Sequence, residues 1–149
     1  MEQIILKKAN LEDIPTLLEI EKSVAGTNIY SPMVEDADWK EEFQKCEVYL
    51  IEHNNMVIGN LSYEKKENDH VYISGLVIKP EFQGQGIGRK VLIKLLEELK
   101  DMRRIDLVTH PDNHHALKLY QSLGFIVESR KENYFGDGEP RLVLVLSRK

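Results

Sequence analysis

A run of three glycines between a strand-like and a helix-like segment constrains this chain more than any other feature. Gly84, Gly86 and Gly88 lie between an apolar stretch at 71–78 and an amphipathic one at 89–100. Glycine lets a backbone turn tightly and approach a ligand without interference from Cβ. The first turn of the following helix presents unpaired N–H groups and the positive end of its dipole. The junction therefore predicts an anion site, for which phosphate is the usual ligand.

The rest of the sequence alternates between strand and helix patterns. We expect strands at 4–6, 48–51, 56–63, 71–78, 105–108, 125–134 and 141–146. Helices are expected at 10–24 with Asn10 as cap, at 35–45, at 89–100, and at 113–123 with Gly124 after it. Gly26, Asn28, Ser31 and Pro32 indicate a loop at 25–34. This order predicts one domain over residues 1–149, an α/β fold with a mixed sheet and helices on its faces.

Composition excludes several classes of function. The net charge is −5, and residues 1–60 hold 12 acidic but only 5 basic side chains. This argues against a nucleic acid partner and suits a cationic co-substrate such as an amine, although it also fits ordinary solvated surface charge. We expect no membrane partner, because no apolar stretch approaches the roughly 20 residues of a membrane span. Met1-Glu2-Gln3 does not begin a signal peptide, and the single cysteine, Cys46, fits a cytoplasmic location as a buried apolar side chain.

The spacing of the glycines separates three kinds of phosphate loop. A P-loop requires Lys followed by Ser or Thr after the last glycine, and this sequence has neither. In a dinucleotide fingerprint the last glycine follows the second by three positions, whereas Gly88 follows Gly86 by two. The third pattern, Gln or Arg, then two residues, Gly, one residue, and Gly or Ala, is filled by Gln83, Gly86 and Gly88. In this segment the sequence resembles the GNAT superfamily of acyl-CoA N-acyltransferases.

A second segment strengthens the resemblance. Residues 113–125, from Asn113 through Tyr120 to Phe125, are similar to the other conserved segment of that family and begin 25 positions after Gly88. The resemblance covers residues 48–148 and implies a GNAT fold. That fold is a mixed, mostly antiparallel seven-stranded sheet with about four helices and two central parallel strands that splay apart.

The resemblance also implies where acetyl-CoA would bind. The backbone of 76–78 would pair with the pantetheine arm, the loop would hold the pyrophosphate, and Asn113 and Tyr120 would contact the arm and the sulfur. The implied contacts are Leu76, Val77, Ile78, Gln83, Gly84, Gln85, Gly86, Ile87, Gly88, Arg89, Asn113 and Tyr120.

Tyr120 is the residue to which the resemblance gives a catalytic role. It is the expected general acid for the coenzyme A sulfur; a buried core tyrosine is the alternative. Tyr120 and Asn113 are seven positions apart, so both face the same side of their helix. Asn113 is both a helix cap and, by resemblance, a contact for the pantetheine arm or the acceptor.

The general base is less well defined. Members of the family carry a glutamate five residues before the motif asparagine, where this chain has Val108, or on the strand before the glycine loop. That strand here offers Tyr72 and Ser74. Three base candidates remain, acting directly or through water: Glu64, Tyr72 and His110. His110, His114 and His115 do not predict a metal site, because no Cys or acidic ligand joins them at a fixed spacing.

The sequence thus predicts a cytoplasmic N-acetyltransferase that moves an acetyl group from acetyl-CoA to a primary amine by direct transfer. The acceptor is a small molecule or a peptide, and the protein a monomer or homodimer. One alternative is a protein N-terminal acetyltransferase of the ribosomal-protein-alanine type, which residues 133–139 resemble. Another is a coenzyme A-binding sensor without catalysis. No motif identifies the amine or excludes other acyl groups. Loops near 25–45 and 134–140 are expected to select the acceptor, and the acidic segment around Trp39 is either a solvated helix face or an amine-attracting rim.

Overall fold

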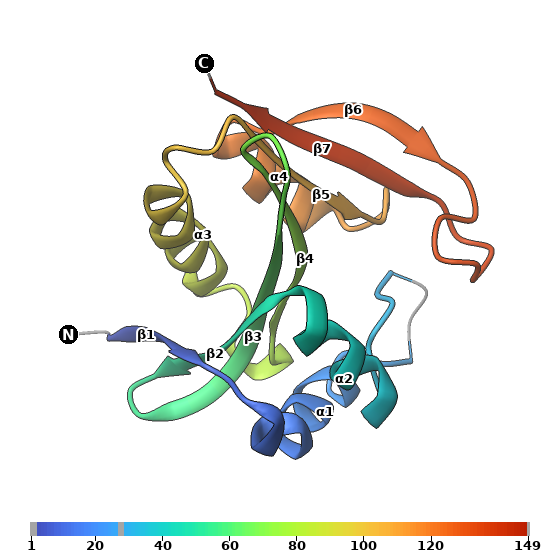
Figure 1. Cartoon of the computed structure of the whole chain (residues 1–149). Helices are drawn as coiled ribbons and strands as arrows, with labels where there is room; N and C mark the ends of the chain where they lie inside the picture. The colour runs from blue at the N-terminus through green and yellow to red at the C-terminus, as the bar shows by residue number, and fades with distance from the viewer. Residues whose placement is uncertain (1–2, 27–28, 149) are drawn as a thin grey trace.

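The computed structural model describes residues 3–26 and 29–148. Across these residues the strands and helices follow in the predicted order (Figure 1). The elements are β1 (Ile4–Lys8), a 3-10 turn (Leu11–Asp13), α1 (Ile14–Lys22), α2 (Asp36–Lys45), β2 (Glu47–His53), β3 (Met56–Lys66), β4 (His70–Ile78), a second 3-10 turn (Pro80–Phe82), α3 (Ile87–Glu98), β5 (Arg104–Thr109), α4 (His114–Ser122), β6 (Ile126–Lys131) and β7 (Arg141–Ser147). Met1, Glu2 and Asn28, which served above as sequence signals, lie outside the described ranges.

The strands of the described residues form one mixed sheet in the order β1-β2-β3-β4-β5-β7-β6. Neighbouring strands are antiparallel except β4 and β5, which run parallel at the centre of the sheet. This arrangement confirms the predicted mixed, mostly antiparallel fold.

The two parallel strands separate soon after they meet. Their register pairs His70–Tyr72 of β4 with Arg104–Asp106 of β5. Just beyond, Ser74 is an extra residue in β4, because Ser62 of β3 pairs with Gly75 while the next residue, Tyr63, pairs with Ile73. Such a bulge bends a strand and increases its twist. The bend coincides with the point at which β4 leaves β5, and it confirms the predicted splay.

The helices cover both faces of this sheet and form two separate cores (Figure 1). On one face α3 packs on the long central strands, and apolar residues of α4 join the same cluster. On the other face α1 and α2 enclose a second cluster around Trp39. Strand β2 shows how the sequence serves both faces, since Val48 and Leu50 belong to the second cluster and Ile51 to the first.

The first predicted helix is divided in two. Asn10 caps it as expected, accepting from the Glu12 N–H at 2.9 Å, and Asp13 completes a capping box. The cap leads into a 3-10 turn, and the α-helix begins only at Ile14 with Pro15 in its first turn. Proline is tolerated there because the first N–H groups of a helix have no intrahelical partner.

The C-terminal hairpin differs from the prediction in its loop. The predicted strand at 125–134 is too long, since β6 ends at Lys131 and residues 132–140 form an extended loop. Asn133 (φ +49°), Gly136 (φ +84°) and Gly138 (φ +83°) adopt left-handed conformations that end the ladder, and Asn133 Oδ1 accepts from the Gly138 N–H at 2.6 Å. The nine-residue loop reaches β4, where the side chains of Tyr134 and Tyr72 share a hydrogen bond.

A buried glutamate of α2 hydrogen-bonds to both strands at the bulge. Glu42 is buried, and its Oε2 accepts hydrogen bonds from the hydroxyls of Ser62 at 2.8 Å and Ser74 at 2.6 Å. Since these serines lie on β3 and β4 at the bulge, Glu42 ties α2 to both strands there. The predicted acidic face of α2 is thus divided, because Glu35, Asp36, Asp38 and Glu41 are exposed whereas Glu42 belongs to the interior.

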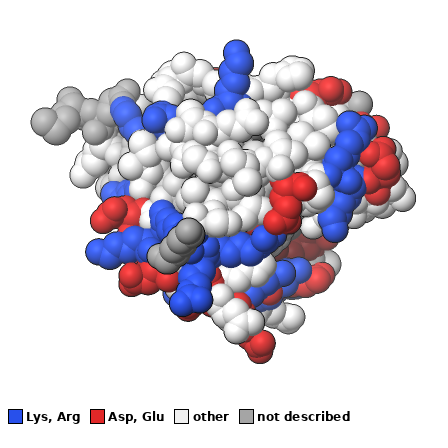
Figure 2. All heavy atoms as spheres, turned by 90° about the horizontal axis from the view of Figure 1, so that it is seen from above, with Lys and Arg blue, Asp and Glu red and all other residues white. Residues whose placement is uncertain are grey.

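The outer surface mixes charges of both signs. Seen from above, Lys and Arg side chains lie beside Asp and Glu around a broad uncharged area (Figure 2). On this face the cations therefore do not gather into the basic stripe that marks a nucleic acid site. Within residues 3–26 and 29–148, no helix combines the length and apolar character needed to cross a membrane.

Glu42→Ala tests the role of the buried glutamate. Removing the carboxylate leaves the buried hydroxyl of Ser62 and the half-buried hydroxyl of Ser74 without their acceptor, so we expect the free energy of unfolding to fall by about 2–4 kcal/mol. Urea denaturation measures this loss. Glu41→Ala is the matched control, since Glu41 is the exposed neighbour on the same helix, and it should cost less than about 0.5 kcal/mol. Equal stability of the two variants would show that the hydrogen bonds of Glu42 at the bulge contribute nothing to the free energy of unfolding.

Candidate functional site

Two cavities open where β4 and β5 separate. The larger is a groove of about 550 Å³ lined by the end of β4, the glycine turn and one side of α4. We call it the glycine groove. It gathers every predicted coenzyme A contact except Gln85, whose side-chain amide instead donates to the Glu81 carbonyl at 3.4 Å. The two motifs of the sequence, far apart in the chain, therefore face one space.

The glycine turn has the geometry of an anion site. Gly84 (φ +78°) and Gly86 (φ +79°) are left-handed, and Gly86 is the residue from which α3 starts. A Cβ placed on either glycine would have no protein atom within 4 Å, so the backbone faces open space. Gln83 ties the turn back to β4 by donating to the Ile78 carbonyl at 2.8 Å. Unpaired N–H groups at the start of α3 can thus contact a phosphate directly.

Cationic side chains stand along the same groove. Arg89 was predicted there, and its Nη1 donates to the Ser122 hydroxyl at 2.6 Å. Lys118 of α4 lines the groove as well, although the sequence motifs did not single it out. Its position was visible in the sequence only as one more charge on α4. The two cations and the helix N-terminus favour a ligand with several negative charges.

Helix α4 contributes two polar groups at the inner end of the groove. Asn113 caps α4, and its Oδ1 accepts from the Ala116 N–H at 3.3 Å, which confirms the structural half of its predicted role. Tyr120 lies two turns further along and packs against Phe125 with the ring centroids 5.9 Å apart. Burial, with a smaller contribution from Tyr30, raises the pKa of Tyr120 to about 12. The phenol therefore keeps its proton throughout the neutral range.

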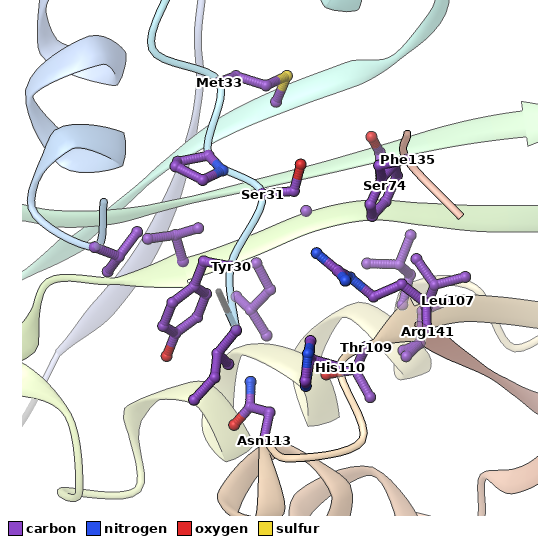
Figure 3. Close-up of a pocket in the computed structure, with 18 of the residues that line it drawn as sticks. Tyr30, Ser31, Met33, Ser74, Leu107, Thr109, His110, Asn113, Phe135 and Arg141 are labelled. Carbon is purple, nitrogen blue, oxygen red and sulfur yellow. The ribbon is translucent and has the colours of Figure 1, made fainter. Parts of the chain in front are cut away.

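The second cavity is smaller, with a volume of about 130 Å³, and buried polar side chains line part of it. We call it the inner cavity. It shares Leu76, Val77, Asn113 and Tyr120 with the glycine groove, together with Tyr30 from the loop before α2. Figure 3 shows side chains from that loop, from β4, from β5 and from the β6–β7 loop converging on it. The two cavities are thus continuous at the end of β4.

The three base candidates are placed very differently. His110 is buried and lines the inner cavity. Its Nδ1 accepts from the Asp112 N–H at 3.0 Å, so Nε2 carries the ring proton and donates to Glu139 at 2.7 Å. Glu64 and Tyr72 are cross-strand partners on β3 and β4 that line neither cavity, and burial raises the pKa of Tyr72 well above its usual range. Of the three, the structure brings only His110 to the cavity.

A buried acid of α1 was missed by the sequence motifs. Glu21 lines the inner cavity and is only 3% exposed. Its two oxygens accept from the Met33 N–H at 3.0 Å and from the Asn60 Nδ2 at 2.9 Å. Burial raises the pKa of Glu21 in spite of these hydrogen bonds. A signal was present, because Glu21 shares the apolar face of α1 with Ile14 and Leu17, where a carboxylate is out of place.

A buried arginine was missed too. Arg141 begins β7, is 2% exposed and lines the inner cavity. Its Nη1 donates to the Pro140 carbonyl at 3.0 Å and its Nη2 to Asp137 at 3.1 Å. Its guanidinium lies 5.1 Å from the ring centroid of Phe135, which also lines the cavity. The only sequence signal was a charged residue at the start of an otherwise apolar strand.

The part of the chain that the structure describes contains no cluster of three or more His, Cys, Asp or Glu side chains placed to hold a metal ion. His114 and His115 both lie in the first turn of α4 and are exposed. His110, by contrast, is held by Asp112 and Glu139 as described above.

Glu21→Gln should change how stability depends on pH. Because the folded-state pKa of Glu21 is raised, its contribution to the free energy of unfolding is fully present below the ordinary value of 4.5 and is lost as pH rises through the folded pKa. Glutamine does not ionise, and Asn60 can turn its amide to pair with it. The free energy of unfolding of the variant, measured by urea denaturation, should therefore rise relative to that of wild type as the pH increases from about 4 to about 8.

The exposed variant Glu12→Gln supplies the baseline for that comparison. Parallel stability curves for Glu21→Gln and wild type across the pH range would contradict the effect of burial on Glu21.

Comparisons with known proteins agree with this geometry. The chain matches the model of the Acetyltransferase (GNAT) family over residues 14–125. It is 30% identical over 145 residues to a candidate ribosomal-protein-bS18-alanine N-acetyltransferase of Bacillus subtilis (strain 168), covering 93% of this chain and 92% of that protein.

Two solved structures show the same fold. The ribosomal-protein-S18-alanine N-acetyltransferase from Escherichia coli superposes with a TM-score of 0.81 at 21% identity, covering 99% of this chain and 94% of the other. A GNAT family acetyltransferase from Elizabethkingia anophelis with acetyl-CoA bound gives 0.76 at 19% identity, covering 99% and 98%. From the family match and the near full-length relative, the chain belongs to the GNAT family of acetyltransferases and is an acyltransferase enzyme.

Proposed function

We propose that this enzyme transfers an acetyl group from acetyl-CoA to a primary amine by direct transfer, with both substrates bound at once. The observation that carries the proposal is the junction of the two cavities. Leu76, Val77, Asn113 and Tyr120 line both of them, so a donor in the glycine groove and an acceptor in the inner cavity would meet there. Holding two reactants at one point lowers the entropic part of the barrier.

The groove fits the parts of acetyl-CoA in order. The glycine turn and the first turn of α3 suit the pyrophosphate, with Arg89 and Lys118 beside it. From Ile73 to Ile78, β4 pairs with β3 on one side, while its other edge has left β5. That free edge can pair with the amide groups of the pantetheine arm as an added strand would. The backbone N–H of Val77 then suits the thioester oxygen, where negative charge develops.

The reaction needs one proton to leave the amine and one to reach the sulfur. The amine nitrogen forms a bond to the thioester carbon, the C–S bond breaks, and Tyr120 gives its proton to the departing sulfur. Because the pKa of Tyr120 is raised to about 12, the phenol is in its acid form at neutral pH. A thiol, with a pKa of roughly 8.5, is a stronger acid than this phenol, so proton transfer from Tyr120 to the thiolate is unfavourable by itself. The transfer is completed only when a proton from the amine returns to the phenolate.

His110 is the base candidate that we retain for the proton that the ammonium form of the acceptor loses before attack, since it lines the inner cavity. To accept a proton at Nδ1 it must first release the Asp112 N–H. Its partner Glu139 would stabilise the imidazolium that forms. Glu64 and Tyr72 could act only through intervening groups, because they line neither cavity.

A protein N-terminus is the second acceptor class that an observation favours. The relative from Bacillus subtilis, similar over most of this chain, carries that activity in its name. Tyr134 and Phe135 are exposed on the loop beside the inner cavity and could contact a peptide. Peptides therefore belong in the acceptor panel beside free amino acids and polyamines.

We also place the enzyme in the cytoplasm. Cys46 is buried, and burial is the main cause that raises the pKa of its thiol to about 12. A thiol so protected from ionisation is a structural apolar group, and it suits a reducing compartment.

Tyr120→Phe tests the proposal. The phenyl ring keeps the contact with Phe125 but has no proton to give, so we expect kcat to fall by about 100-fold or more. The dissociation constant for acetyl-CoA, measured by calorimetry, should stay within about twofold, because the phosphates and the pantetheine arm are bound elsewhere. Thiol release with a panel of amines measures the turnover.

Tyr49→Phe is the matched control, since Tyr49 lies on β2 and lines neither cavity. Unchanged turnover in Tyr120→Phe would remove the general acid from the account. Tight acetyl-CoA binding by wild type without turnover of any amine would favour a coenzyme A sensor.

A further inference from the structure

The inner cavity contains a buried cation that the transfer reaction itself does not use. Figure 3 shows the guanidinium of Arg141 pointing into the cavity between Tyr30, Ser31 and His110. Only two of its five N–H groups, one on Nη1 and one on Nη2, have a hydrogen-bond partner among the described residues. The remaining donors belong to a side chain that is 2% exposed and lines the cavity wall.

Such a group is costly to bury unless an anion meets it. Taking a guanidinium out of water is repaid only by good geometry and by partners for its remaining protons. Asp137 supplies one contact from the 132–140 loop, but its own side chain is 36% exposed, so solvent screens the pair. Guanidinium binds carboxylate best through two parallel hydrogen bonds, and the unused donors leave room for that arrangement.

The carboxylates that line the cavity or lie beside it do not meet this need. The carboxylate of Glu21 is held by Met33 and Asn60, and that of Glu139 faces His110. A polyamine entering the cavity would face the positive charge of Arg141. The carbonyl of a neutral peptide amide could accept one of the free N–H groups, but it would bring no negative charge to the guanidinium.

We propose that the acceptor amine carries a carboxylate, which the guanidinium of Arg141 binds inside the inner cavity. The acceptor class is then a small amino acid, with its amine at the junction near Tyr120 and its carboxylate at Arg141. The cavity volume of about 130 Å³ is well below that of sites for drug-sized ligands, which suits a compact acceptor. This inference rests on the proposed function and names the substrate class of that site.

The test compares acceptors that differ only in the carboxylate. Thiol release from acetyl-CoA is measured with L-alanine against L-alaninamide, and with L-alanine against ethylamine. Wild type should favour the carboxylate member of each pair in kcat/KM by roughly 30-fold or more. The other member has no carboxylate and cannot form the buried charge pair with Arg141. Arg141→Gln should abolish this preference through a higher KM for the amino acid, while turnover of the amide persists and shows that the variant is folded.

Two further variants separate binding from a structural role. Asp137→Asn removes the ion pair on the loop but leaves the guanidinium in place, so the preference for carboxylate should remain. Arg141→Lys keeps the charge without the planar fork and should retain part of the preference. Equal loss of preference in Asp137→Asn and Arg141→Gln would overturn the proposal, since Arg141 would then serve only to hold the loop.

A binding measurement decides the matter without turnover. Calorimetry on the coenzyme A-saturated protein compares N-acetyl-L-alanine with N-acetyl-L-alaninamide. Tighter binding of the acid in wild type, lost in Arg141→Gln, supports the carboxylate site. Equal binding of the two, or a wild-type preference for amides or amidated peptides in turnover, contradicts it. Efficient acetylation of amines lacking a carboxylate would leave the proposed function standing and this inference overturned, whereas no turnover of any amine would count against the proposed function.

Discussion

The bulge at Ser74, held by the buried carboxylate of Glu42, is the constraint on which the rest of the site depends. Parallel pairing between β4 and β5 ends at Tyr72, and the bulge bends β4 away just beyond. Continued pairing would satisfy the edge of β4 internally and close the space that both cavities occupy. Because Glu42 accepts hydrogen bonds from Ser62 and Ser74 together, helix α2 fixes the bend from the face of the sheet that α1 and α2 cover.

The space between the separated strands β4 and β5 gives the two substrates different environments. On one side the glycine turn, the start of α3 and the cations Arg89 and Lys118 form an exposed, positively polarised groove. On the other side Glu21, His110 and Arg141 bring buried charge and polarity into a small cavity. The 132–140 loop closes that cavity, because Glu139 pairs with His110 and Asp137 with Arg141. A phosphate-bearing donor and a small amine thus have distinct places that share one junction.

The sequence predicted the donor side far better than the acceptor side, and the difference has a physical cause. Gly84 and Gly86 supply the left-handed backbone of the turn, and the spacing of Asn113 and Tyr120 puts both on one face of a helix. Both features depend on residues close in the sequence, so the sequence pattern predicts them. Glu42, Glu21 and Arg141 act through partners 20 or more positions away or through a cavity built from several segments. Their burial follows from packing, which no local pattern reports. The early end of β6 was missed because Asn133 took the left-handed conformation that glycine usually supplies.

The most direct test of this account is a crystal structure of the protein soaked with acetyl-CoA. We predict the pyrophosphate against the backbone N–H groups of 84–88, the pantetheine arm along the free edge of β4, and the thioester at the junction between Val77 and Tyr120. The inner cavity should remain open beyond the thioester for the acceptor. Acetyl-CoA bound with its thioester away from Tyr120, or with its pyrophosphate away from the glycine turn, would contradict the central claim that the two cavities meet at the reacting atoms.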